Sequence, residues 1–392
     1  MQNFPEVADV FRAHGPAYRQ SHEMPLRHLR AMRAIEICRT AVLGGHVDEC
    51  EHCGALKISY NSCRNRHCPK CQCLDKERWL EARKEDLLPT RYFHVVFTLP
   101  ESLRPLALRN QEAIYSILFR AASQTLREVT QDPKHLGAET GIIAILHTWS
   151  QTLMDHPHLH CIVTGGGLSR DGKRWIRCKG RFLSPVKVLS RVFRGKFLAF
   201  LKEIRDKGTL SFSGHIASLK EGGAFKDLLT SLHGQEWVVY CKPPFHDVEK
   251  VMDYLGRNTH RVAISNNRLV KLQEGQVTFR YRDRHHKDTL KLMTLEASEF
   301  IRRFLLHILP NGFVKIRHYG ILSNRNRKTQ LPRCRELLGV RCPHENTQKP
   351  REPWQDLLTR ITGTDPRICP FCGKGKMRFK KTLAVSPLSL PP

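Results

Sequence analysis

Three histidines stand close together in the segment MDHPHLHCIVTGGG at residues 154–167. His158 and His160 are separated by one leucine and open an apolar run that is typical of a β-strand. Because side chains two residues apart point to the same face of a strand, these two imidazoles would meet at one point. His156 precedes Pro157, and we expect it in the turn before the strand.

A third imidazole comes from the preceding apolar run, IIAILHTW. If residues 141–149 and 158–164 form an antiparallel hairpin centred near 152–153, His147 falls opposite His158. Three protein ligands with open positions are a catalytic metal geometry, although imidazole by itself favours zinc, iron or copper over magnesium. The competing interpretation is that one or two of these histidines are core residues with satisfied hydrogen bonds.

The charge of the chain indicates a polyanionic partner. The 392 residues contain 65 Lys and Arg against 37 Asp and Glu, a net charge of +28 that is spread along the sequence. This imbalance favours nucleic acid, with several surfaces that face it. A phosphodiester is then the natural substrate of the histidines. Attack by water would make the protein a nuclease, whereas attack by a side chain would allow the strand to be rejoined.

The segment DVEKVMDYLGRNTHR at residues 247–261 offers a nucleophile. From Val248, apolar residues recur at helical spacing, and Tyr254 lies on the flank of that stripe. Asn258, one turn later, shares the flank. The ring of such a tyrosine can pack while its hydroxyl stays outside. Taken alone, the segment favours an ordinary half-buried tyrosine over a nucleophile.

Fourteen cysteines indicate metal binding rather than a disulfide framework, since we expect a reducing compartment. The block CEHCGALKISYNSCRNRHCPKCQC contains two Cys-x-x-Cys pairs. These pairs predict one structural zinc site with the ligands Cys50, Cys53, Cys68 and Cys71. Spare donors are Cys63, His67 and Cys73. With four protein ligands the ion would be closed to substrate and would serve folding. Buried reduced thiols are the alternative interpretation.

A further pair, Cys369-x-x-Cys372, stands near the end of the sequence. It suggests a second zinc site whose remaining ligands would be Cys334 and Cys342, or His344, at irregular spacing.

The expected elements mix strands and helices without strict alternation, and several strand pairs are close enough for hairpins. We expect strands at 91–100, 141–149, 158–164, 236–243, 261–265, 277–283 and 313–318, and helices at 24–43, 74–88, 103–128, 185–205, 246–257 and 296–308. This pattern favours an α+β fold on an antiparallel sheet. We expect a zinc-binding and DNA-binding domain at residues 1–89 and a catalytic domain at residues 90–320. A basic C-terminal region at residues 321–392 would carry the possible second zinc site.

Together these features resemble one family, the rolling-circle transposases of the HUH type (His-hydrophobic-His, two-tyrosine class) with a zinc-binding N-terminal domain. The resembling segments, in the expected order, are CEHCGALKISYNSCRNRHCPKCQ, HTWSQTLMDHPHLHCIVTGGGL, WVVYCKPPF, YLGRNTHRVAISNNRL and IRHYGILSNRNR. The resemblance implies an HUH endonuclease core with a split βαβ, ferredoxin-like sheet. It also implies magnesium or manganese at His158 and His160, where the expected hairpin adds His147 as the third imidazole.

The resemblance further implies that Tyr254 attacks single-stranded DNA at the element ends. The products are a 5′-phosphotyrosine and a free 3′-OH, which later join element and target DNA without ATP. Two-tyrosine members carry a second tyrosine four residues after the first, and here that position is Asn258. The chain therefore resembles the single-tyrosine branch. Either Tyr254 acts twice, or two protomers of a homodimer cooperate, or this copy is impaired; Asn258 could act as an accessory polar ligand.

Other functions fit the sequence less well. A plasmid relaxase or replication initiator shares the His-x-His and tyrosine chemistry, and a non-catalytic zinc-finger DNA-binding protein would leave the histidines without a role. In GLSRDGKR at 167–174, Arg174 replaces the hydroxyl that a P-loop needs, and Asp171-Gly172 is typical of a hairpin turn. A tyrosine recombinase has no use for His-x-His.

With neither a signal peptide nor a membrane span expected, we predict a cytoplasmic, nucleoid-associated bacterial protein.

Overall fold

A computed structural model describes residues 4–180, 183–245, 247–258, 263–283, 286, 288–340 and 352–386, with the backbone alone at 72–73 and 257–258. It shows a mixed α+β protein with antiparallel sheets, which confirms the predicted fold class. None of the helices in these ranges is long and apolar enough to cross a membrane.

The largest sheet has six strands and carries the histidines. Its order is β11-β4-β5-β3-β7, with β6 paired to β5, and every neighbouring pair is antiparallel. The strands are β3 (Tyr92–Thr98), β4 (Ala138–Trp149), β5 (Asp155–Ser169), β6 (Trp175–Arg177), β7 (Val239–Phe245) and β11 (Ile316–Gly320). Because β3 and β4 both run antiparallel to β5 between them, they are parallel to each other. The segment from β3 through helix to β4 is thus a split βαβ unit.

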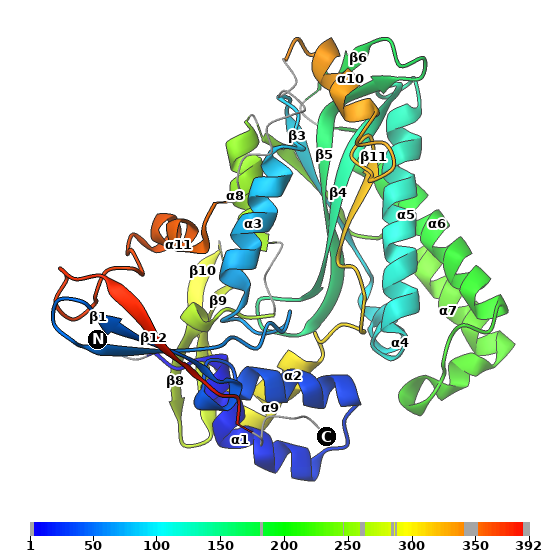
Figure 1. Cartoon of the computed structure of the whole chain (residues 1–392). Coiled ribbons are helices and arrows are strands. Elements are labelled where there is room, and N and C mark those ends of the chain that lie inside the picture. The colour runs from blue at the N-terminus through cyan, green and yellow to red at the C-terminus, as the bar shows by residue number, and fades with distance from the viewer. Residues whose placement is uncertain are drawn as a thin grey trace.

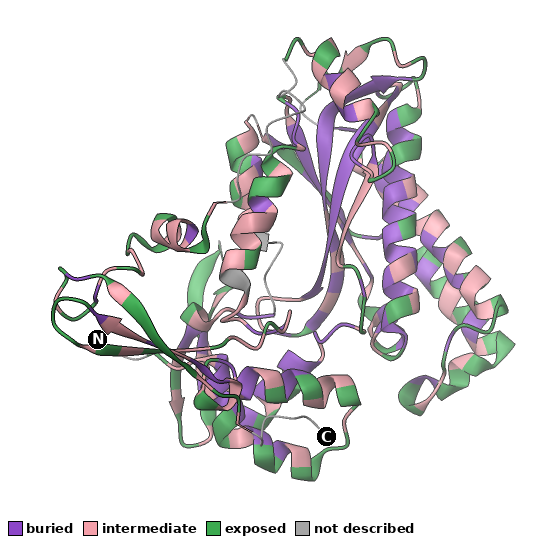
Figure 2. Ribbon diagram, in the orientation of Figure 1, coloured by how far each residue is buried: buried purple, intermediate pink, exposed green. Residues whose placement is uncertain are grey.

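Helices cover both faces of this sheet (Figure 1). One face packs against α4 (Arg104–Arg109), α5 (Gln111–Gln131), α6 (Val186–Asp206) and α7 (Gly222–Gly234). The other face packs against α3 (Gln72–Lys84), α8 (Val248–Asn258) and α10 (Gln330–Leu337). Figure 2 shows the central strands β3, β4 and β5 mostly buried between these layers. Burial on both faces accounts for the long apolar runs in β3, β4 and β5.

A second hydrophobic core joins the two N-terminal helices to a segment late in the chain. The helices α1 (Val7–Ser21) and α2 (Leu26–Glu36) pack against α9 (Ala297–Leu305) and a sheet of β8 (Leu269–Gln273), β9 (Gln276–Asp283) and β10 (Thr289–Glu296). The rings of Phe11 and Phe304 meet edge to face at 5.3 Å. Side chains from residues 7–71 therefore share a core with residues 263–308, whereas Leu80, Leu87 and Leu88 pack on the large sheet.

The third sheet contains strands from both ends of the chain, in the order β12-β1-β2. These strands are β1 (Gly45–Cys50), β2 (Leu56–Tyr60) and β12 (Met377–Leu383). A helix, α11 (Trp354–Thr362), precedes β12. Short 3-10 helices complete the described elements: η1 (Ala41–Leu43), η2 (Glu101–Leu103), η3 (Gly214–Lys220) and η4 (Asn266–Arg268).

Most expected elements are confirmed within a few residues, and three are wrong for physical reasons. The helix expected at 24–43 ends at Glu36, since Cys38 leaves it to join other cysteines. The helix expected at 103–128 is broken at Asn110, whose side-chain amide donates to the carbonyls of Leu106 and Ser211. The described part of the strand expected at 261–265 is not a strand, because Ala263 has a φ of 26°, outside the extended region; Ala263 and Ile264 are buried in the second core.

Candidate active site and cysteine clusters

The three histidines of the hairpin meet on one face of the large sheet. His147 of β4 pairs directly with His158 of β5, which confirms the predicted register. His160 follows on the same face, and the ligand nitrogens of the three rings lie within 4.8 Å of one another. We call His147, His158 and His160 the histidine site. His147 is buried and the other two are half-buried, so the site opens to one side.

A hydrogen bond fixes how one of these rings is protonated. His158 Nδ1 lies 2.6 Å from the carbonyl oxygen of His156. Because a carbonyl only accepts, Nδ1 carries the proton and Nε2 carries the lone pair that a metal needs. His156 itself lies within β5, with its ring 5.0 Å from that of His158, and the prediction that it sits in the turn is wrong.

Tyr254 lies against the histidine site. Its hydroxyl is 2.7 Å from His160 Nδ1 and 2.9 Å from His94 Nε2. The helix α8 brings it there because Val251 and Leu255 are buried under the sheet, leaving Tyr254 half-buried on the flank. The sequence predicted the position on the flank, but not how close the hydroxyl would come to the histidines. The side chain of Asn258 lies outside the described residues, and its role stays a prediction.

His94 is a site residue that the sequence analysis missed. It lies on β3, is 4% exposed, and its Nε2 is 2.9 Å from His160 Nδ1. Its ring centroid is 4.6 Å from that of Tyr254. The sequence contained one indication of this role, a histidine inside the apolar run YFHVVFT. Its place in the site becomes visible only once β3 is known to pair with β5. The hydroxyl of Tyr254 and the two ring nitrogens thus form a compact triangle.

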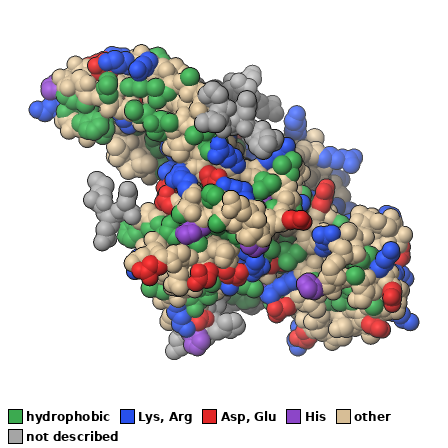
Figure 3. Space-filling view, turned by 90° about the horizontal axis from the view of Figure 1, so that it is seen from below, with side chains coloured by type: hydrophobic (Ala, Val, Ile, Leu, Met, Phe, Trp, Pro, Cys, Tyr) green, Lys and Arg blue, Asp and Glu red, His purple; other side chains and the backbone are tan. Residues whose placement is uncertain are grey.

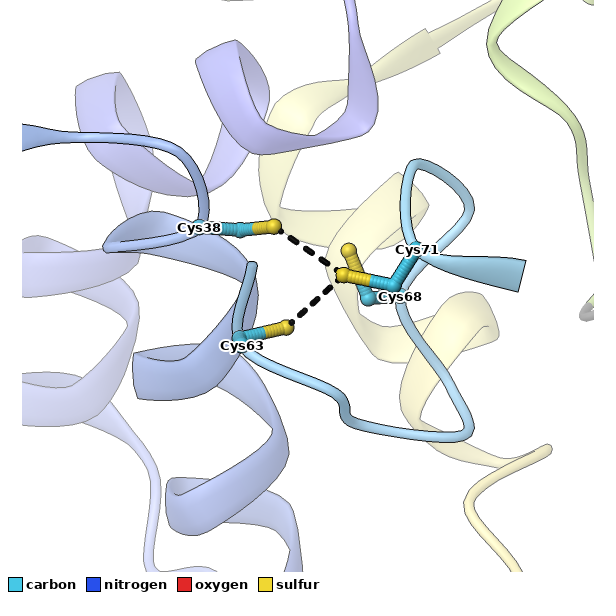
Figure 4. Close-up of side chains that lie close together, drawn as sticks. All are labelled: Cys38, Cys63, Cys68 and Cys71. Carbon is cyan, nitrogen blue, oxygen red and sulfur yellow. Dashed lines mark hydrogen bonds between the residues drawn. The ribbon is translucent and has the colours of Figure 1, made fainter. Parts of the chain in front are cut away.

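The first group of cysteines differs from the predicted quartet. Cys38, Cys63, Cys68 and Cys71 offer four sulfur atoms within 4.8 Å of one another, and we call them the core cysteine cluster (Figure 4). Cys71 Sγ lies 3.2 Å from Cys38 Sγ and 3.5 Å from Cys63 Sγ. Cys38 follows α2, while the other three come from the segment before α3, and the cluster is part of the second hydrophobic core.

The chemistry of this donor set fits zinc. Hydrogen bonds from the thiols of Cys38 and Cys63 hold the pKa of Cys71 well below its usual range. A thiolate is the form that binds metal, and four cysteine sulfurs are a structural zinc set. His67, named as a spare donor, instead accepts a hydrogen bond from the backbone N–H of Leu309.

The second group contains Cys50 and Cys53 from the turn between β1 and β2 and Cys369 and Cys372 from the turn before β12. We call these four the bridging cysteine cluster. The predicted quartet is therefore wrong as a set, since its two pairs belong to different clusters. The predicted second set is wrong too. Cys334 is buried on α10 among apolar side chains, and Cys342 lies outside the described residues.

Comparisons with known proteins agree with this architecture. A family model described as "Putative transposase" matches residues 141–330, which include the histidine site and Tyr254. A second model, described as "Transposase zinc-binding domain", matches residues 10–99, which include the core cysteine cluster. The chain is thus a transposase with an N-terminal zinc-binding domain.

Two relatives narrow the class further. "Putative transposase y4qJ" of Sinorhizobium fredii (strain NBRC 101917 / NGR234) is 53% identical over 375 residues, covering 95% of this chain and 94% of that protein. The transposase for insertion sequence element IS801 of Pseudomonas savastanoi pv. phaseolicola is 27% identical over 359 residues, covering 90% and 83%. The chain belongs to the family of IS91/IS801-type transposases.

Proposed function

We propose that this transposase nicks and joins single-stranded DNA at the ends of an insertion sequence, with Tyr254 as the nucleophile. The observation that carries the proposal is the 2.7 Å contact between the Tyr254 hydroxyl and His160, one of three imidazoles gathered on the same face. A tyrosine packed for structure alone has no need of this neighbourhood. The second enzymatic candidate, a relaxase or replication initiator, shares the chemistry, but the relatives are transposases.

The chain's own groups account for the proton of the nucleophile. Of the two ring nitrogens near the Tyr254 hydroxyl, His94 Nε2 can accept that proton. His160 Nδ1 cannot accept it while the same ring holds a metal, because one nitrogen of a neutral metal-bound imidazole binds the ion and the other carries the proton. The tyrosine oxygen then bonds to phosphorus, the bond from phosphorus to the 3′ oxygen breaks, and the 3′ oxygen takes up a proton. The products are a 5′-phosphotyrosine and a free 3′-OH. Attack by a 3′-OH reverses the step, so the phosphodiester bond energy is kept and ATP is not used.

The donor set of the histidine site fits a divalent metal, because three imidazoles converge and one of them has its tautomer fixed. His147, His158 and His160 would hold magnesium or manganese, which when bound polarises the scissile phosphate and orients it toward Tyr254. Soft imidazole ligands are unusual for these ions, and oxygen atoms of DNA and water would complete the shell.

The charge distribution supports a DNA substrate. Lysine and arginine side chains appear over several parts of the face drawn in Figure 3, rather than in one tail. We propose single-stranded DNA at the element ends and target DNA as the partners, in the cytoplasm of a bacterium. Since the second tyrosine is replaced by Asn258, joining requires either a second use of Tyr254 or a second protomer.

The test uses single strands that carry the element end, labelled at either the 5′ or the 3′ terminus, with magnesium, manganese or EDTA. Wild type, Tyr254→Phe and His158→Ala are compared on a denaturing gel. Matched controls are Tyr281→Phe on β9 and His233→Ala on α7, both outside the site. We expect a covalent adduct on the 5′-phosphate side only with metal, retained in both controls and lost in both site variants. Binding without any adduct would make the chain a DNA-binding protein without this chemistry.

A further inference from the structure

The two ends of the chain share one small sheet. β1 lies in its centre and pairs with β2 on one side and with β12 on the other, so that Glu49 faces Arg378 and Gly45 faces Leu383. Figure 1 shows the blue β1 beside the red β12. At the tip, the backbone N–H of Glu51 donates to the carbonyl of Lys376 at 3.0 Å. Segments more than 300 residues apart in sequence are therefore adjacent at the bridging cysteine cluster.

The two turns that carry these cysteines have the same construction. In the first, the N–H of His52 lies 3.4 Å from Cys50 Sγ, and the N–H of Gly54 donates to the Cys50 carbonyl at 3.0 Å. In the second, the N–H of Phe371 lies 3.4 Å from Cys369 Sγ, and that of Gly373 donates to the Cys369 carbonyl at 2.9 Å. Both glycines have positive φ, 67° and 66°. Each Cys-x-x-Cys-Gly turn thus points two sulfurs to the same side.

The four sulfurs are spaced as ligands of one ion would be. Cys50 Sγ is 3.7 Å from Cys372 Sγ, and Cys53 Sγ is 3.8 Å from Cys369 Sγ. A tetrahedron with zinc–sulfur bonds of ~2.3 Å has edges of ~3.8 Å. The two turns also fit closely, since a Cβ on Gly375 would lie 2.5 Å from Cys50 Sγ.

Apolar packing supplies little to hold this sheet. Five of the seven residues of β12 are exposed, and within the described ranges the three hydrophobic clusters contain no side chain of β1, β2 or β12. A sheet of three short strands with so small a core usually needs a disulfide or a metal. The described cysteines of this cluster are free thiols, which leaves the metal.

We propose that Cys50, Cys53, Cys369 and Cys372 bind a second Zn²⁺, which joins the two ends of the chain into one zinc-bound sheet. This site is distinct from the core cysteine cluster, and half of its ligands lie outside the zinc-binding domain matched at residues 10–99. The ion is structural, because four thiolates leave it no open position.

The first test measures the zinc content of the purified full chain by elemental analysis. The parent protein carries His158→Ala, so that zinc bound at the histidine site does not contribute to the measured content. We expect two equivalents in this parent and one in both the Cys50→Ser/Cys53→Ser and the Cys369→Ser/Cys372→Ser variants. Combining all four substitutions should still leave one equivalent, since both pairs serve the same ion. Cys334→Ala, which removes a buried thiol outside the clusters, should leave two. Equal zinc in the parent and either double variant would overturn the proposal.

The second test is amide hydrogen exchange along β12 and β1. We expect the amides of residues 377–383 to lose protection in the Cys369→Ser/Cys372→Ser variant, while those of the large sheet stay protected. A parent in which cobalt replaces zinc should show sulfur-to-cobalt absorption that falls by about half in the same variant. Unchanged protection in β12 would contradict the joining role, and an unchanged cobalt spectrum would contradict the ligand set.

Discussion

The histidine site and the bridging cysteine cluster are both small groups of metal-ligand side chains, but they are assembled over very different distances in sequence. His147, His158 and His160 come from one hairpin, whereas Cys53 and Cys369 are 316 positions apart. The hairpin positions its histidines through register alone, close to a nucleophile. The cysteines lie at the end of a backbone pairing between distant segments that has little apolar packing to support it. One group serves chemistry and the other serves architecture, and substitutions should separate these roles.

The largest expected effect is loss of folding at the core cysteine cluster. Cys63→Ser/Cys71→Ser removes two ligands of a site inside the second hydrophobic core. Structural zinc supplies roughly 10–16 kcal/mol to small domains, as much as the whole stability of many proteins. Thermal unfolding followed by circular dichroism should then lack the cooperative transition of the second core, which contains α1, α2 and α9. The control Cys334→Ala should keep this transition. A variant with parental melting and parental zinc content would show that these cysteines are not ligands.

At the active site, the expected loss concerns chemistry and not folding. His94→Gln keeps a polar partner for the Tyr254 hydroxyl but removes the basic nitrogen. We expect strand cleavage to slow by about 10²–10⁴-fold, the usual contribution of a positioned acid or base. The melting temperature and the DNA affinity measured by fluorescence anisotropy should stay unchanged. In the control His135→Gln, at an exposed histidine, the cleavage rate, melting temperature and DNA affinity should all stay unchanged. Cleavage at the wild-type rate would remove His94 from the mechanism.

A smaller effect concerns the contact between the two cores. His307 follows α9 and bonds through Nδ1 to the Thr148 hydroxyl and through Nε2 to the carbonyl of Leu153, in the hairpin that carries the histidine site. Complete burial lowers the pKa of His307 to about 4, so the unfolded chain binds the extra proton between pH 6.5 and 4. The stabilisation is present above about pH 6.5 and is lost as the pH falls toward 4.

Acidification from pH 7 to pH 5 should therefore lower the free energy of unfolding by about 2 kcal/mol through the titration of His307. Urea denaturation at the two pH values checks the figure, with His307→Gln as the variant that cannot titrate. The variant should lose correspondingly less stability on acidification than wild type. Equal losses would mean that the ring is not buried in neutral form.

The smallest expected effect is at the support of His147. The ring of Trp149 stacks on that of His147 with centroids 4.7 Å apart and planes 19° apart. Groups that orient a metal ligand typically contribute 10- to 100-fold to affinity or rate, and stacking alone should lie at the low end. We expect Trp149→Leu to raise the manganese concentration needed for half-maximal cleavage about 10-fold, with folding intact. Trp354→Leu on α11 is the matched control.

Whether a feature could be predicted from the sequence depends on how its residues are brought together. The apolar runs of β4 and β5 and the short connection between them were enough to pair His147 with His158. The position of Tyr254 on a helix flank followed from periodicity. What periodicity could not supply was which elements meet. The contact of Tyr254 with His94 needs α8 to cover the face formed by β3 and β5, and that is a property of the whole sheet.

The cysteines show the same limit more severely. Two adjacent Cys-x-x-Cys pairs favour a single local site, yet Cys50 and Cys53 face the pair near the other end of the chain. The spacing identifies each Cys-x-x-Cys turn, but it does not indicate which cysteines come together in one metal site. Cys38 carried no motif at all. It joins Cys63, Cys68 and Cys71 because α2 ends early and packs on α9.

The pairing of β1 with β12 also has a consequence for synthesis. The ribosome releases Cys53 long before Cys369, and at about 5–20 residues per second the 316 positions between them take roughly 15 to 60 s. During that interval one edge of β1 has no neighbour and two thiols have half of their ligand set. A chain whose translation stops early can build the large sheet and Tyr254 but not this junction. Completion of the sheet therefore distinguishes chains translated through β12 from chains that stop before Cys369.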